Sequence, residues 1–248
     1  KFGLFYDRAM KLGADYVATG HYAKKEKRGN SFALLKGKDP GKDQSYFLSF
    51  IRPSVLANLL FPVGNHLKSE VRAYAKKIGL PNAERKDSQG ICFLGNIRYS
   101  DFVKHHLGIR HGDLINRRTG EKMGTHDGFW YYTIGQRQGI KLSGGPWYVI
   151  SKNIKKNIIY IGGKDDLPAQ SSKEIKITKI NWLTGRPPKK RILGVRIRHT
   201  GEIYPAKIIL NRGGGGTVLL QQGRYDAAPG QFAVLYDGVR CLGGGVIK

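Results

Sequence analysis

The chain has 248 residues, of which 40% are apolar, so it can form two or three domains with ordinary hydrophobic cores. Its 43 lysines and arginines outnumber 18 acidic residues, and the resulting net charge of +25 indicates a polyanionic partner. No run of about 18 apolar residues occurs, which excludes a membrane-spanning helix. Two cysteines are too few for a disulfide framework.

The first part of the chain, residues 1–94, has the pattern of the end of an α/β domain. Residues 2–12 are predicted to be helical, and residues 14–19 form a short apolar strand that ends at Gly20 and His21. Ligands of open α/β sheets bind beyond the carboxyl ends of the strands, so these two residues are candidates for ligand contact. A loop histidine with an internal hydrogen bond is the alternative for His21.

A helix-rich stretch follows. Helical segments are predicted over residues 46–50 and over 55–60, the second capped by Ser54. An amphipathic helix is predicted over 68–78, and Gly79 and Pro81 end it. The triplet Lys42, Asp43 and Gln44 either contacts phosphate or forms a solvated helix start.

Cys92 lies where a polar turn runs into a short apolar segment. The neighbouring Arg85 and Lys86 would favour its thiolate, the form that acts as a nucleophile or sulfur carrier. An inert buried thiol is the alternative. Cys241 lies in an apolar strand pattern and is predicted to be structural.

Residues 95–165 are predicted to form a small α+β domain, with a helix over 99–107 and short strands separated by glycines. The segment 134–139 is a polar, basic loop, and 141–146 is a turn and not a phosphate-binding loop, because no helix follows it. Trp130-Tyr131-Tyr132 could stack on bases, but in an alternating strand such residues more often belong to the core.

Residues 166–248 contain six short alternating strands with glycine turns, which is typical of a small closed β-barrel. The strands are expected at 175–180, 193–198, 204–210, 217–221, 231–236 and 240–247. Arg196, Arg198 and His199 would form an exposed basic edge along which an RNA backbone could run, or an ordinary solvated strand face.

Seven motifs stand in the order found in one enzyme family, and together they cover essentially the whole chain. The sequence resembles the tRNA-specific 2-thiouridylases (MnmA/TrmU). The motifs are Ala18-Thr19-Gly20-His21-Tyr22, Lys42-Asp43-Gln44-Ser45-Tyr46-Phe47, Phe61-Pro62-Val63-Gly64, Asp87-Ser88-Gln89-Gly90-Ile91-Cys92-Phe93, Thr133-Ile134-Gly135-Gln136-Arg137, Pro146-Trp147-Tyr148-Val149 and Cys241-Leu242-Gly243-Gly244-Gly245.

The resemblance implies an α/β fold. Residues 1–94 would be the carboxyl-terminal part of an adenine nucleotide α-hydrolase-like (PP-loop) domain, residues 95–165 a small α+β domain, and residues 166–248 a six-stranded β-barrel that binds tRNA. The implied reaction adenylates the C2 oxygen of wobble uridine 34 with ATP, with Mg²⁺ accompanying the nucleotide. Sulfur from a persulfide then replaces that oxygen and gives 2-thiouridine.

The resemblance also assigns roles to particular residues. Cys92 matches the catalytic cysteine that bears the persulfide, and Gly20 matches a glycine at ATP. The positions that match tRNA contacts are His21, Lys42, Asp43, Gln44, Arg198, His199 and Gln231. A cysteine desulfurase or a sulfur-relay protein would supply the sulfur, and the family's chemistry includes a disulfide bond.

Two family features are absent from these 248 residues: the Ser-Gly-Gly-x-Asp-Ser pyrophosphate loop and an earlier catalytic cysteine. We therefore expect this polypeptide alone to be unable to adenylate uridine, as a truncated enzyme would be. The alternatives are a non-catalytic tRNA-binding module and a persulfide carrier that acts through Cys92. A bacterial protein of this family would be cytoplasmic, and a eukaryotic one mitochondrial or plastidic.

Overall fold

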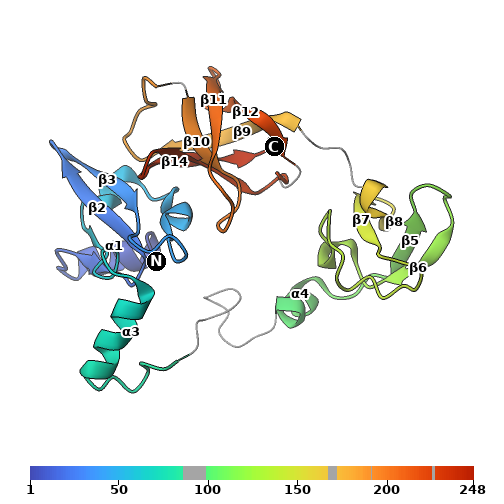
Figure 1. Ribbon diagram of the computed structural model, residues 1–248, viewed down its shortest axis with the longest axis horizontal. Helices are drawn as coiled ribbons and strands as arrows, with labels where there is room; N and C mark the ends of the chain where they lie inside the picture. The colour runs from blue at the N-terminus through green and yellow to red at the C-terminus, as the bar shows by residue number, and fades with distance from the viewer. Residues whose placement is uncertain (86–98, 167–171, 191, 225–226) are drawn as a thin grey trace. The chain divides into compact units, whose positions relative to one another are not determined.

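The computed structural model describes residues 1–85, 99–166, 172–190, 192–224 and 227–248 (Figure 1). The chain divides into two compact units. One contains Lys1–Arg85 together with Ser171–Lys248, and the other contains Lys86–Gln170. The first unit thus joins the beginning of the chain to its end.

The amino-terminal part of the first unit is a small α/β arrangement. Helix α1 (Leu4–Lys11) leads to strand β1 (Val17–Ala18), which pairs in parallel with β4 (Leu59–Leu60). The 3₁₀ helix η1 (Ser45–Leu48) and the helices α2 (Pro53–Leu56) and α3 (Lys68–Lys77) complete it. These elements confirm the predicted first helix, the first strand and the amphipathic helix that begins at Lys68.

The predicted helix over residues 55–60 was wrong. Helix α2 begins at Pro53, whose fixed φ suits the first turn, and its N-cap residue is Arg52 instead of Ser54. The helix has ended by Leu59 because Leu59 and Leu60 pair with β1, and the side chain of Leu59 is fully buried there.

A β-hairpin that the sequence analysis did not predict connects this region to the barrel. Strands β2 (Ala23–Arg28) and β3 (Ser31–Lys36) pair with each other, and β3 continues the sheet next to β14 (Arg240–Ile247). Five of the six residues of β2 are charged and its last three are exposed, so the strand lacks the apolar alternation by which strands are usually recognised.

The carboxyl-terminal part forms the predicted six-stranded barrel. Its other strands are β9 (Ser172–Trp182), β10 (Ile192–Arg196), β11 (Tyr204–Leu210), β12 (Gly216–Arg224) and β13 (Phe232–Asp237). The strand order is β13-β10-β11-β12-β9-β14, and the antiparallel pairing of β13 with β14 closes the sheet. Alternate apolar side chains fill the interior, among them Val195, Val218 and Leu235.

Glycine lets β14 approach its neighbour β9 closely. Gly243 has a φ of +129°, and a Cβ atom there would lie 1.9 Å from the carbonyl oxygen of Asn181. Any side chain would therefore push β14 away from β9, which explains the need for glycine at this point of the barrel.

The second unit has its own core and sheet. Helix α4 (Tyr99–Leu107) precedes β5 (Gly112–Asn116) and β6 (Lys122–His126), and β7 (Tyr148–Asn153) and β8 (Ile158–Gly162) follow. The strand order is β6-β5-β8-β7, with β5 parallel to β8. The predicted helix and short strands are confirmed, but the strand at Trp130 was wrong, because the 3₁₀ helix η2 (Phe129–Tyr131) occupies it. A second 3₁₀ helix, η3 (Lys164–Asp166), follows β8.

Within the described ranges, no helix combines the length and the apolar character needed to cross a bilayer.

Candidate functional site

The predicted site residues that the structure describes all belong to the first unit. Cys92, the predicted sulfur carrier, lies outside the described residues. The remaining candidates come from three regions that are far apart in the sequence: the loop after β1, the segment before and within η1, and the barrel. Backbone and side-chain hydrogen bonds bring these three regions together.

Gly20 and His21 follow the carboxyl end of β1, as predicted. Gly20 is exposed, and the space that a Cβ atom would occupy has no atom within 4 Å, so the backbone can be approached closely. The His21 imidazole Nδ1 lies 3.0 Å from the hydroxyl of Thr19, and its ring packs against Phe2. Burial, with the positive charges at Lys1, lowers the pKa of His21 to about 4, so the ring is neutral at pH 7.

Gln44 connects this loop to the next region. The backbone N–H of Tyr22 donates to the Gln44 side-chain carbonyl at 3.0 Å, and the Gln44 N–H donates to the Tyr22 carbonyl at 2.9 Å. Gln44 therefore holds the residue after His21 beside the triplet that begins at Lys42. The Gln44 side-chain oxygen thus already accepts a hydrogen bond within the protein, from the Tyr22 N–H.

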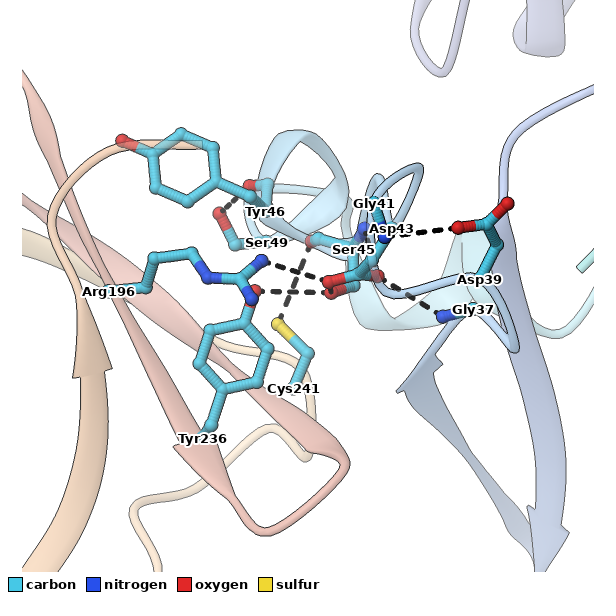
Figure 2. A network of polar contacts seen from close by, with 10 residues as sticks. All are labelled: Gly37, Asp39, Gly41, Asp43, Ser45, Tyr46, Ser49, Arg196, Tyr236 and Cys241. Atoms are coloured by element: carbon cyan, nitrogen blue, oxygen red, sulfur yellow. Dashed lines mark hydrogen bonds and ion pairs between the residues drawn. The ribbon is translucent and has the colours of Figure 1, made fainter. Parts of the chain in front are cut away.

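Asp43 is the centre of a buried polar network between the η1 segment and the barrel (Figure 2). Its residue is only 3% exposed, and its carboxylate accepts hydrogen bonds from the Gly37 N–H and from the N–H and hydroxyl of Ser45, at 3.0–3.1 Å. The guanidinium of Arg196 donates to it at 2.9 Å. Because all these donors belong to the protein itself, Asp43 fixes the positions of Gly37, Ser45 and Arg196.

The structure corrects the prediction that Arg196 belongs to an exposed basic edge. Its side chain is 13% exposed, it forms the ion pair with Asp43, and its guanidinium lies over the ring of Tyr236. Arg196 points away from the barrel interior because side chains alternate here: Val195 and Ile197, on either side of it, fill the barrel, and Arg196 faces the η1 segment. The sequence pattern alone could not show that the carboxylate of Asp43 lies next to Arg196 on this outer face of the barrel.

Tyr236 and Cys241 complete the network from the barrel side. The Tyr236 hydroxyl lies 3.1 Å from the Ser45 hydroxyl, and the Cys241 thiol donates to the Ser45 carbonyl at 3.8 Å. Burial raises the pKa of Tyr236 well above its usual value and that of Cys241 to about 12. Cys241 is 1% exposed and stays a neutral thiol, which confirms its structural role.

An aromatic pair, the exposed Phe47 and the half-buried His199, lies beside this network, and Phe47 was not among the predicted site residues. The Phe47 ring is 59% exposed and lies 4.3 Å from the His199 ring, with 39° between their planes. The Tyr46 hydroxyl lies 2.9 Å from the carbonyl oxygen of Ile197 and 3.0 Å from that of Phe232, and it shares its one hydrogen between these two acceptors. Burial and the nearby Arg196 lower the pKa of His199, so its ring is neutral at pH 7.

The remaining residues predicted to contact tRNA are sequence neighbours of the residues described above. Arg198 is exposed between Ile197 and His199, and Lys42 is half-buried beside Asp43. Gln231 precedes Phe232, and its side-chain oxygen accepts a hydrogen bond from the Ala228 N–H at 3.4 Å. We use the name polar strip for the residues that these contacts connect: 20–22, 42–47, 196–199 and 231–232.

The described residues contain neither a cysteine pair nor a metal centre. Cys241 is free and buried, so a disulfide bond is not supported for this chain. No group of three or more His, Cys, Asp or Glu side chains in the described ranges is placed to hold an ion.

Comparison with protein-family models matches almost the whole chain in three consecutive segments. Residues 1–96 match the tRNA methyl transferase HUP domain, residues 100–163 the tRNA methyl transferase PRC-barrel domain, and residues 172–247 the aminomethyltransferase β-barrel domain. The chain therefore contains a HUP-domain portion, a PRC-barrel middle domain and a carboxyl-terminal β-barrel.

Individual relatives match the chain from end to end. It is 44% identical to the tRNA-specific 2-thiouridylase MnmA 1 of Bacteroides thetaiotaomicron, and the match covers 100% of this chain and 71% of the relative. It is 41% identical to MnmA of Halalkalibacterium halodurans, with 100% and 67% covered, and 43% identical to MnmA of Porphyromonas gingivalis, with 100% and 71% covered.

Proposed function

Because the chain belongs to the MnmA family of tRNA-specific 2-thiouridylases, we propose that it binds tRNA through the polar strip and carries on Cys92 the persulfide sulfur that is destined for C2 of wobble uridine 34. The observation that carries this proposal is the convergence of the candidate residues. The loop after β1, the η1 segment and the barrel are distant in sequence, yet hydrogen bonds through Gln44, Asp43 and Tyr46 join them.

The strip has the chemistry that single-stranded RNA requires. Unpaired bases of an RNA loop stack on aromatic side chains, and the exposed Phe47 ring beside His199 offers such a surface. Arg198 and Lys42 supply positive charge for the phosphates, and the chain's net charge of +25 draws a polyanion toward it. The buried ion pair of Asp43 with Arg196 holds the η1 segment against the barrel, so Asp43 acts as a positioning residue.

The loop at Gly20 is the proposed contact for the nucleotide. Its backbone is exposed at the carboxyl end of a parallel strand, with open space in place of a side chain. ATP supplies the adenylation that turns the C2 oxygen of uridine into a leaving group. The described residues contain no group of three or more His, Cys, Asp or Glu side chains that could hold Mg²⁺.

Cys92 is the proposed sulfur carrier. Its persulfide would add its terminal sulfur to C2 of the activated uridine, and AMP would leave with the oxygen. The sulfur–sulfur bond must then break by attack of a second thiol on the Cys92 sulfur. Cys241 does not suit this role, because its thiol is buried, and burial raises its pKa to about 12. The second thiol must therefore come from outside these 248 residues.

The proposal is tested by loading the chain with sulfur. After incubation with a cysteine desulfurase and cysteine, mass spectrometry of alkylated peptides should find the persulfide on Cys92, with none on Cys241. The variant Cys92→Ser should lose the modification and Cys241→Ser should keep it. A persulfide that persists in Cys92→Ser would contradict the assignment.

The same preparation tests the activity of this polypeptide by itself. With ATP and tRNA added, we expect sulfur to stay on Cys92 and no 2-thiouridine to form, because the 248 residues contain neither a pyrophosphate loop nor a suitable second thiol. Robust formation of 2-thiouridine, detected in digested tRNA by chromatography with mass spectrometry, would overturn this expectation.

A further inference from the structure

We propose that the second unit carries a separate binding pocket for one nucleotide unit, an aromatic base with its phosphate. The pocket is lined mainly by two loops, residues 133–139 and 141–147. Both loops precede β7, which is labelled in Figure 1. Both loops belong to motifs that the proposed sulfur transfer leaves without a role. The inference is independent of that chemistry, since it concerns binding by the second unit.

The pocket has the size of a small-ligand site. Its volume is about 330 Å³, and small-molecule pockets occupy roughly 300–1,000 Å³. The lining residues are Arg137, Ile140, Lys141, Leu142, Gly145, Pro146 and Trp147.

Hydrogen bonds within each loop hold the pocket walls in place. The Gln136 side chain accepts from the Thr133 N–H at 2.9 Å and donates to the Gln138 carbonyl at 2.8 Å, so it braces the first loop from inside. In the second loop the Trp147 indole N–H donates to the Ser143 carbonyl at 2.8 Å. A pocket with walls fixed in this way needs little ordering when a ligand binds.

The chemistry of the lining selects an aromatic anion. Ile140, Leu142 and Trp147 pack into the core of the unit and give the pocket an apolar wall with an indole ring. Arg137 and Lys141 are exposed at its rim. Among the described residues that line the pocket none is acidic, so neither cation is neutralised there. The indole suits a base and the two cations suit a phosphate.

Lys141 provides an independent indication that the site is functional. Its φ is +50°, in the left-handed region that a lysine rarely adopts. Residues kept in this region against their preference cluster at ligand sites, where the surrounding structure fixes them. Here the strained backbone places a cationic side chain on the rim of a pocket.

The test is a titration followed by two-dimensional ¹H–¹⁵N NMR of the whole chain. The chain has three tryptophans and therefore three indole signals, and Trp147→Phe identifies the relevant one. The probes are uridine 5′-monophosphate, uridine, inorganic phosphate and a short oligouridylate. We expect the monophosphate to shift the Trp147 signal saturably, and uridine and phosphate to bind more weakly because each makes half of the contacts.

Matched variants locate the phosphate. Lys141→Asn removes the charge but tolerates the left-handed backbone, and we expect it to weaken monophosphate binding roughly fivefold. Lys141→Arg should retain the wild-type affinity, and Arg137→Gln should weaken it as Lys141→Asn does. Unchanged shifts of the other two indole signals would show that the variants are folded.

The outcomes separate the possible sources of the nucleotide. A response to the monophosphate identifies a site open to free nucleotides, and a response to oligouridylate alone identifies a site for a nucleotide within RNA. Either response with the expected variant effects supports the pocket. No saturable Trp147 shift with either probe, or a shift that Lys141→Asn and Arg137→Gln leave unchanged, overturns it. Failure of sulfur transfer from Cys92 would not affect this result.

Discussion

Phe47 and His199 show how single residues of the polar strip can distinguish an RNA base from a general polyanion. The two ring centroids lie 4.3 Å apart, and neither ring carries charge at pH 7, because burial lowers the pKa of His199. Stacking is therefore their contribution, and charge belongs to Arg198 and Lys42. The exposed part of the Phe47 ring offers a face on which a base can stack.

The variant Phe47→Ala tests this division of roles. Stacking on one aromatic ring is worth roughly 1–3 kcal/mol, so we expect about tenfold weaker tRNA binding with an unchanged dependence on salt. Phe47→Tyr retains the ring and should keep the wild-type affinity. Fluorescence anisotropy of labelled tRNA measures both quantities. A loss of affinity in Phe47→Ala that comes with a smaller salt slope would assign the residue to phosphate binding instead.

At the scale of elements, the contact between the η1 segment and β10 holds the strip together. The ion pair of Asp43 with Arg196 is buried, and removing one partner leaves the other charge without compensation. The exposed pair of Lys190 with Asp237 has a similar distance, 2.7 Å, but both side chains are in contact with water. These two pairs allow a matched comparison of burial.

We expect Asp43→Asn to lower the free energy of unfolding by about 3–5 kcal/mol and Asp237→Asn by less than about 1 kcal/mol. In the double variant Asp43→Asn with Arg196→Met, the combined loss should be clearly smaller than the sum of the two single losses, because no charge is left unpaired. Urea denaturation followed by circular dichroism gives these values. Additive losses would show that the two residues act independently.

Elements with regular apolar patterns were predictable from sequence. The barrel strands, α3 and α4 follow such patterns, and the structure confirms them. Strand β2 was missed because its charged residues show no alternation, and residues 55–60 were read as helix because an apolar run does not distinguish a helix from a short buried strand. Their conformations depend on pairing partners that lie elsewhere in the chain.

The candidate site was predictable in part, for a similar reason. The motifs drew attention to the neighbourhood of Asp43, Gln44 and His199, but motif order does not show which side chains are buried. Asp43 proved to be an internal acceptor and Arg196 its partner, and the exposed ring of Phe47 became visible only with its packing against His199. Burial and tertiary contacts decide these roles.

For the whole molecule, the charge distribution and the family both point to RNA as the partner. Basic residues outnumber acidic ones in both halves of the chain, and the related enzymes are named for their action on tRNA. A polyanion bound through several phosphates releases counterions, so its affinity must fall steeply as salt is added. The central claim is that the polar strip provides part of this contact.

The most direct test measures tRNA binding to the wild-type chain and to Arg198→Gln by fluorescence anisotropy at several salt concentrations. We predict that affinity falls steeply with salt in the wild type, and that Arg198→Gln weakens binding and lowers the salt slope by about one. The control Arg52→Gln, which removes an exposed arginine paired with Asp7 outside the strip, should leave the slope nearly unchanged. Absence of tRNA binding at low salt, or equal slopes for Arg198→Gln and the wild type, would contradict the account.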